Sequence, residues 1–82
     1  MFIVYILQSE KDLSYYIGQT NDLERRLKDH NRGKCKYTKN KIPWQVVGKE
    51  FFDTRREAMK REKEIKRKKS KKYICRLINK IG

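Results

Sequence analysis

Two short β-type segments separated by a polar stretch are the feature that most restricts the fold of this chain. Residues 1–7 read Met-Phe-Ile-Val-Tyr-Ile-Leu, and residues 15–18 read Tyr-Tyr-Ile-Gly. Both are rich in aromatic and β-branched side chains, which favour strands, whereas residues 8–14 are polar and turn-forming. The pattern predicts a β-hairpin. Strand alternation places Tyr5 and its odd-numbered neighbours on one face and the even-numbered residues on the other.

A helix is expected after the hairpin. Asn21 with Glu24 three residues later resembles a capping box. Leu23 and Leu27 stand at i and i+4, which gives this helix an apolar inner side. Gly33 is a suitable residue just beyond its end.

A third strand and a second helix are expected in the second half of the chain. Trp44–Phe52 is again apolar and aromatic, and Gly48 within it suggests a bulge or a close backbone approach. Thr54 and Glu57 form a capping box for a helix that reaches about Lys68. The order β-β-α-β-α predicts a small α+β fold, and 82 residues suffice for one domain only.

The last residues form a basic, amphipathic tail, which we place at 71–82 behind a core of residues 1–70. Its apolar residues recur at helical spacing, so a short C-terminal helix is expected. They are Ile74, Leu77, Ile78 and Ile81.

The charge of the chain predicts a polyanionic partner. Twenty-three Lys and Arg against ten Asp and Glu give a net charge of +13. Nucleic acid is the first candidate and an anionic membrane surface the second. No run of 18 apolar residues occurs, and Met1–Leu7 is too short for a signal peptide, so we expect a cytoplasmic protein that does not enter a membrane.

The cysteines and the histidine do not form a zinc motif. Cys35 and Cys75 are far apart, and His30 is the only histidine. A structural zinc site needs four such ligands at short spacings. Two reduced thiols are expected, although a disulfide stays open at this stage.

Glu62 occupies a position of the second helix at which an apolar side chain would be expected. In the second helix, Ala58, position 62 and Ile65 fall on the apolar side. A carboxylate buried there must be paired, metal-bound or protonated, because an isolated one is costly to bury. The alternative is a glutamate at the edge of the apolar side that pairs with Lys66 at i+4.

Arg26 and His30 stand at i and i+4 on the first helix, so their side chains share a face that adjoins Leu23 and Leu27. The planar fork of an arginine suits a phosphate. The ordinary alternatives are a solvent-exposed Arg26 beside Arg25, and a His30 that the helix dipole favours near the C-terminal end.

Two stretches of this chain resemble the halves of the GIY-YIG nuclease signature. Val4-Tyr5-Ile6 is followed eleven residues on by Tyr16-Ile17-Gly18. Residues 16–31 and 58–66 resemble the second half of the domain and its metal-carboxylate helix. The resemblance covers residues 1 to about 70. It implies a three-stranded antiparallel sheet packed by helices and an endonuclease that cuts DNA, as relatives do in repair and recombination.

The resemblance also implies residue roles. Tyr5 would act as the general base or its helper, Tyr16 would order the nucleophile, and His30 would assist the tyrosine. Arg26 would contact the scissile phosphate, and Gly18 would allow a close approach. Glu62 would hold Mg²⁺ or Mn²⁺. One carboxylate suffices because Mg²⁺ keeps waters and takes phosphate oxygens. The pKa of Tyr5 would have to fall from about 10, and the positive surroundings are expected to lower it, giving an alkaline optimum.

Further residues are expected to contact the DNA backbone, with structure rather than sequence deciding where the protein binds. They are Arg25, Lys36, Tyr37, Lys39, Arg55, Arg56, Lys60, Arg61, Lys66 and Arg67. Two departures from the family pattern are Val4, which replaces the first motif glycine, and Asn79, which cannot be aligned with the family's late asparagine and receives no role. The alternative function is a DNA-binding module of little or no activity that recruits other factors, and a protein partner stays open.

Overall fold

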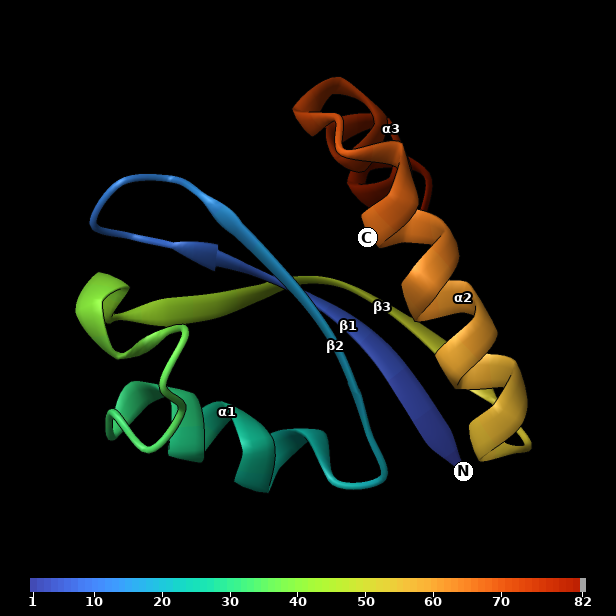
Figure 1. Ribbon diagram of the computed structural model, residues 1–82, viewed down its shortest axis with the longest axis horizontal. Coiled ribbons are helices and arrows are strands. Elements are labelled where there is room, and N and C mark those ends of the chain that lie inside the picture. The colour runs from blue at the N-terminus through green and yellow to red at the C-terminus, as the bar shows by residue number, and fades with distance from the viewer. Residues whose placement is uncertain (82) are drawn as a thin grey trace.

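Three strands form one antiparallel sheet in the computed structural model, which describes residues 1–81 (Figure 1). Strand β1 (Phe2–Ser9) lies in the centre and pairs with β2 (Tyr15–Thr20) and β3 (Trp44–Phe52), so the order is β2-β1-β3. The expected hairpin, third strand and α+β class are confirmed. Strand β2 runs two residues past Gly18, where the apolar pattern stops.

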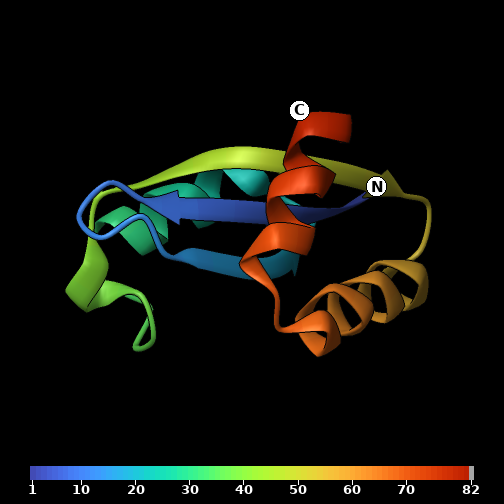
Figure 2. The same ribbon diagram turned by 90° about the horizontal axis from the view of Figure 1, so that it is seen from above.

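Three α-helices cover the two faces of the sheet. Helix α1 (Leu23–Asn31) follows the hairpin, a 3₁₀ turn η1 (Lys39–Lys41) precedes β3, and α2 (Arg55–Lys68) and α3 (Lys71–Ile81) close the chain. Figure 2 shows α1 behind the sheet and α3 crossing in front of it. The protein is therefore a three-layer arrangement with the sheet in the middle.

Alternation along β1 supplies both layers. Tyr5 and Leu7 pack with Trp44 and the partly buried Leu23 and Leu27 on the α1 side. The even-numbered residues pack on the other side with the helices α2 and α3, in a cluster made of Val4, Ile6, Ile17, Ala58, Ile65 and Leu77. The predicted division of the strand into two faces is confirmed.

Helix α3 belongs to this second core. Leu77 is 8% exposed and lies in the buried cluster, with Ile74, Ile78 and Tyr73 packed against it. The short amphipathic helix expected at the end of the chain is thus present, and one face of it packs into the core within the described residues.

Two local predictions have different outcomes. The capping box of Asn21 and Glu24 is wrong, because Asp22 caps α1 by accepting from the Arg25 amide at 3.2 Å, and the Thr20 hydroxyl holds the Asp22 amide at 3.1 Å. Thr54 caps α2 as expected. An irregularity at Gly48 is also confirmed.

At that glycine the β1–β3 pairing changes register. Ile6 lies opposite Gly48 while Leu7 lies opposite Val46, so Val47 is an additional residue in β3. Cys35 and Cys75 are both free thiols. None of the helices within residues 1–81 has the length and apolar character to cross a membrane.

Candidate active site

Tyr5 and Gly18 lie opposite each other in the β1–β2 ladder. The Tyr5 ring is 1% exposed and extends across residue 18. A Cβ atom at that residue would lie 2.4 Å from the Tyr5 hydroxyl oxygen and 2.5 Å from the ring carbon that bears it. Only glycine leaves room for the phenol, so the close approach expected at Gly18 is made by the Tyr5 side chain.

His30 binds the Tyr5 hydroxyl from α1. Its Nε2 atom lies 3.0 Å from the Tyr5 oxygen, and its Nδ1 atom lies 2.8 Å from Oγ1 of Thr38. The Thr38 hydroxyl donates to the Cys35 carbonyl at 3.5 Å, so its oxygen accepts from the imidazole. This arrangement puts the proton of a neutral His30 on Nδ1 and leaves Nε2 to accept the Tyr5 proton.

Burial sets the proton affinities of this pair. Desolvation raises the pKa of Tyr5 to about 12, outweighing the opposing effect of Arg26. The expected lowering of the Tyr5 pKa is therefore wrong. Burial, followed by the charge of Arg26, lowers the pKa of His30 below 6.5. At neutral pH the pair thus consists of a phenol and a neutral imidazole.

Arg26 links the buried pair to the surface. The neighbouring Tyr5 hydroxyl raises the pKa of its guanidinium, which keeps the charge in place. The same side chain lines a polar pocket of about 540 Å³ together with Asn21, Asp22 and Arg25. A phosphate in this pocket would therefore meet the Arg26 guanidinium.

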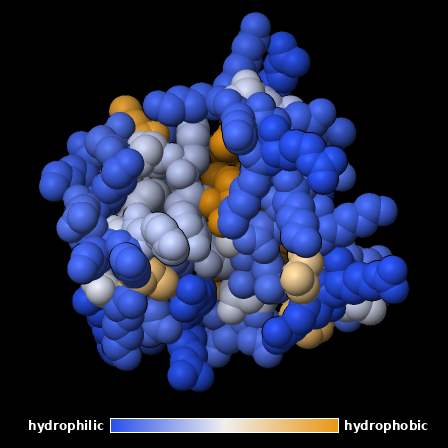
Figure 3. Space-filling model, in the orientation of Figure 1, coloured by the Kyte–Doolittle hydropathy of each residue, from blue (hydrophilic) through white to orange (hydrophobic). Residues whose placement is uncertain are grey.

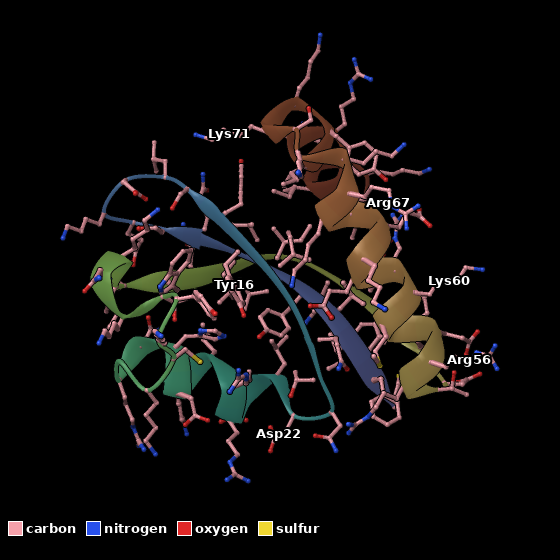
Figure 4. All side chains as sticks on the ribbon, in the orientation of Figure 1. Tyr16, Asp22, Arg56, Lys60, Arg67 and Lys71 are labelled. Carbon is pink, nitrogen blue, oxygen red and sulfur yellow. The ribbon has the colours of Figure 1, made fainter. Side chains whose placement is uncertain are left out.

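Tyr16 lies beside the buried pair, near the edge of the sheet. Its ring centroid is 6.5 Å from that of Tyr5 and 5.0 Å from that of His30. The side chain is only partly buried, and Figure 4 shows it between α1 and α2. From α2, Nζ of Lys66 lies 5.9 Å from the centroid of the same ring. Tyr16 therefore joins the α1 side of the site to the α2 side.

Glu62 is connected to Tyr16 by Lys66, which contacts both side chains. Its carboxylate lies 2.7 Å from Nζ of Lys66, and its side chain is 19% exposed between the buried Ala58 and Ile65 positions of α2. Both sequence interpretations hold in part, since the carboxylate is largely covered and also pairs at i+4. Within residues 1–81 no three His, Cys, Asp or Glu side chains come together as a metal site.

That donor set limits the ion that could bind. A single hard carboxylate suits Mg²⁺ or Mn²⁺ that keeps most of its waters and takes oxygens from a phosphate. It does not suit a zinc ion, which would need several protein ligands. The residues present thus fit a substrate-assisted site for a hydrated divalent ion at Glu62.

Most of the expected DNA contacts are exposed, and one is not. Arg61 donates to both carboxylate oxygens of Glu50, at 2.7 and 3.3 Å, and also pairs with Glu64. It therefore fastens α2 to β3 and is not a free cation for phosphate. Tyr37 is 82% exposed, and the following residues are exposed too: Arg25, Lys36, Lys39, Arg55, Arg56, Lys60, Lys66 and Arg67.

The exposed cations occupy different sides of α2. Arg56 and Lys60 project from its outer side, away from the sheet (Figure 4). Lys66 lies on the inner side with Glu62 and Tyr16. The basic helix therefore presents charge both at the candidate site and away from it.

Thr38 and Trp44 were not expected at the site. Trp44 is 4% exposed, its indole donates to the Thr38 carbonyl at 2.9 Å, and its ring packs edge-on to Tyr16. Asn31 in turn accepts from the Trp44 amide at 2.6 Å. Together these bonds hold the loop that presents Thr38 to His30. No motif distinguishes Thr38 in a loop of similar polar residues.

Sequence comparison identifies related proteins. A protein-family model described as the GIY-YIG catalytic domain matches residues 1–74. The UPF0213 protein YazA of Bacillus subtilis is 50% identical over 68 residues, covering 78% of this chain and 69% of the relative. A UPF0213 protein of Clostridium perfringens is 50% identical over 68 residues, covering 82% of this chain and 72% of the relative.

A solved structure shows the same fold. The solution NMR structure of the UPF0213 protein BH0048 from Bacillus halodurans superimposes with a TM-score of 0.60 at 38% identity. The match covers 96% of this chain and 84% of that one. The motif residues, the fold and these relatives together show that this chain belongs to the GIY-YIG catalytic domain family, within its UPF0213 group.

Proposed function

We propose that this protein is an endonuclease that hydrolyses DNA phosphodiester bonds with the help of one divalent ion. The observation that carries the proposal is the buried hydrogen bond between Tyr5 and His30, 3.0 Å long, with Arg26 beside it. A proton acceptor next to a cation, on a chain of net charge +13, suits an attack on phosphorus.

The proton path follows from the two pKa shifts. With a pKa of about 12, Tyr5 is almost entirely protonated at neutral pH. A mechanism that starts from the ionised tyrosinate would therefore be slow. The Tyr5 oxygen instead takes a proton from the attacking water while its own proton passes to Nε2 of His30. The water oxygen bonds to phosphorus, the 3′ oxygen leaves, and the proton on His30 returns to solvent.

Arg26 and Glu62 serve the phosphate in this scheme. Arg26 would donate to the phosphate oxygens, where negative charge grows as water attacks. Glu62 would hold the divalent ion, which when bound stabilises charge on the phosphate and the leaving oxygen. Lys66, whose Nζ lies 2.7 Å from Glu62, keeps that carboxylate on the inner side of α2.

The substrate is DNA held by its backbone. The exposed lysines and arginines around the site favour phosphate contacts, which carry no sequence information. A structure-directed role in DNA repair or recombination, a cytoplasmic location and help from a protein partner are part of the same proposal.

A second function has observations of its own. One Glu62 oxygen is engaged by Lys66, and burial raises the pKa of Tyr5 away from neutrality. Both features would also suit a DNA-binding module with little turnover. Such a module would bind DNA as well after Glu62→Gln as before.

Cleavage assays separate the two. Labelled branched, nicked and plain duplex DNA would be incubated with Mg²⁺, with Mn²⁺ and with chelator, using wild type and Glu62→Gln. Glu24→Gln is a matched control because it removes the carboxylate of another i, i+4 pair with a lysine, on the exposed side of α1. We expect metal-dependent products from wild type and the control only. Equal binding by all three proteins with no cutting would contradict the nuclease and favour the module.

A further inference from the structure

A hollow of about 370 Å³ lies between β2 and the junction of α2 with α3. Figure 3 shows it as an apolar strip between a pale surface on one side and strongly hydrophilic side chains on the other. None of the roles given above uses this hollow as a whole. Strand β2 contributes Tyr15, Tyr16 and Ile17 to its lining, and the two helices contribute Ile65 and Ile74.

The inner part of the hollow is apolar. Ile65 and Ile17 are only 1% and 6% exposed, and the partly buried Ile74 completes the hydrocarbon. Tyr15 and Tyr16 add aromatic surface from β2. Such a lining favours a flat, weakly polar group over a phosphate or a sugar hydroxyl.

The rim is cationic. Lys66, Lys69 and Lys71 are all exposed and surround the apolar floor. Lys69 ends α2 in the left-handed conformation with φ 47°, and α3 begins two residues later. The rim therefore offers the ammonium groups of Lys69 and Lys71 at a tight turn, beside Lys66, which is paired with Glu62. These cations complement a chain of phosphates.

Tyr16 belongs to the hollow and to the catalytic cluster. Its ring centroid is 5.0 Å from that of His30, and Nζ of Lys66 lies 5.9 Å from it on the side of α2. An occupant of the hollow would consequently contact a ring that also packs against His30. Continuity with the site and the charge of the rim both indicate DNA as the occupant.

We infer that this hollow binds one unpaired nucleobase next to the scissile phosphate. A base in an intact duplex is stacked on both faces and paired along one edge, so it cannot enter without being flipped out. A base in a bulge, flap or branch is free to stack on aromatic side chains. The inference rests on the proposed nuclease function and adds the class of DNA to it.

Binding without cleavage tests the inference. Affinity would be measured in chelator for a labelled duplex with a one-nucleotide 2-aminopurine bulge and for the same duplex fully paired. We expect the bulged DNA to bind about tenfold tighter, as one stacked base allows. We also expect the 2-aminopurine emission to change on binding. Equal affinities, or an unchanged emission, would overturn the inference.

Two variants locate the effect. Tyr15→Ser and Ile74→Ser each remove part of the apolar lining and should bring the ratio of the two affinities close to one. Lys63→Ala, on the same outer surface of α2 as Arg56 and Lys60, should leave the ratio unchanged. Partial unfolding would lower both affinities equally, so the ratio stays informative. A wild-type ratio in both lining variants would overturn the inference.

The outcome is independent of the nuclease test. A protein that cuts DNA but binds bulged and paired duplex equally would retain the proposed function and lose this inference. A protein that prefers the bulge but never cuts would lose the proposed function while the hollow keeps its ligand.

Discussion

The hydroxyl oxygen of Tyr5 lies 2.4 Å from the point where residue 18 would carry a Cβ atom. The tyrosine of the first motif half therefore occupies the space that a side chain at residue 18, opposite it in the β1–β2 ladder, would need. Since the same hydroxyl binds His30 at 3.0 Å, any displacement of the ring also breaks the proposed proton path.

Gly18→Ala should consequently cost activity as well as stability. The added methyl must push the Tyr5 ring aside, at an expected loss of about 1–3 kcal/mol in the free energy of unfolding. Loss of the aligned hydroxyl should lower the cleavage rate about 100-fold. Gly33→Ala is the control, because at φ +79° the alanine would strain the backbone while its Cβ would meet Ile42 and Lys39 and not Tyr5. Equal activity loss in both variants would show that instability alone is responsible.

Thr38→Val tests the orientation of His30. Valine keeps the shape of threonine and removes the acceptor 2.8 Å from Nδ1, so the Nδ1–H tautomer loses its support. We expect cleavage to fall about tenfold, within the range that proton transfer contributes. Long-range ¹⁵N–¹H NMR spectra should show Nδ1–H in wild type and a tautomer mixture in the variant. An unchanged tautomer and rate would remove Thr38 from the site.

The pH dependence follows from His30. Its folded pKa is lowered below 6.5, so the unfolded chain binds more protons as pH falls through this range. Stability contributed by the neutral ring is present above pH 6.5 and is lost below it. The melting temperature should therefore drop between pH 7 and pH 5, and less steeply in His30→Gln.

The cleavage rate should show the same acid limb. It should fall about tenfold per pH unit below the His30 pKa, because a protonated ring cannot accept the Tyr5 proton. Above pH 7 it should level off, since Tyr5 with a pKa of about 12 stays protonated. A rate that keeps rising tenfold per unit to pH 10 would instead indicate free tyrosinate as the base.

Substitution of Arg61 should affect stability, whereas substitution of Arg67 should affect DNA binding. Arg61→Ala leaves the largely covered Glu50 without its two hydrogen bonds and should cost about 1–3 kcal/mol of unfolding free energy. Arg67→Ala removes an exposed cation and should weaken DNA binding with little change in stability. Urea unfolding and salt-dependent binding would measure both. The reverse assignment would restore Arg61 to the DNA interface.

The spacing of apolar residues is sufficient to predict the fold, because each strand or helix buries a face on which those residues recur. Tyr5 and its neighbours alternate along β1, and Ala58 and Ile65 mark the inner side of α2. The cap of α1 was misplaced because two adjacent residues, Asn21 and Asp22, are both good caps, and only the Thr20 hydroxyl bond selects the second.

The site was only partly predictable for a related reason. The spacing of the motif is sufficient to identify Tyr5, Gly18 and His30. The pKa of Tyr5 could not be predicted from the net charge, because burial has the larger effect on it. Thr38 acts through a loop folded against Trp44, a contact that no local pattern encodes. Arg61 looks like its basic neighbours until Glu50, eleven residues away, is placed beside it.

The most direct test asks whether Tyr5 and Glu62 serve one reaction. Single-turnover cleavage of one branched DNA in Mg²⁺ would be compared for wild type, Tyr5→Phe, Glu62→Gln and the double variant. Residues that act as a unit are strongly non-additive. We expect each single variant to lose about 100-fold or more and the double variant to lose little beyond the worse single one. Wild-type rates in either single variant would contradict the account.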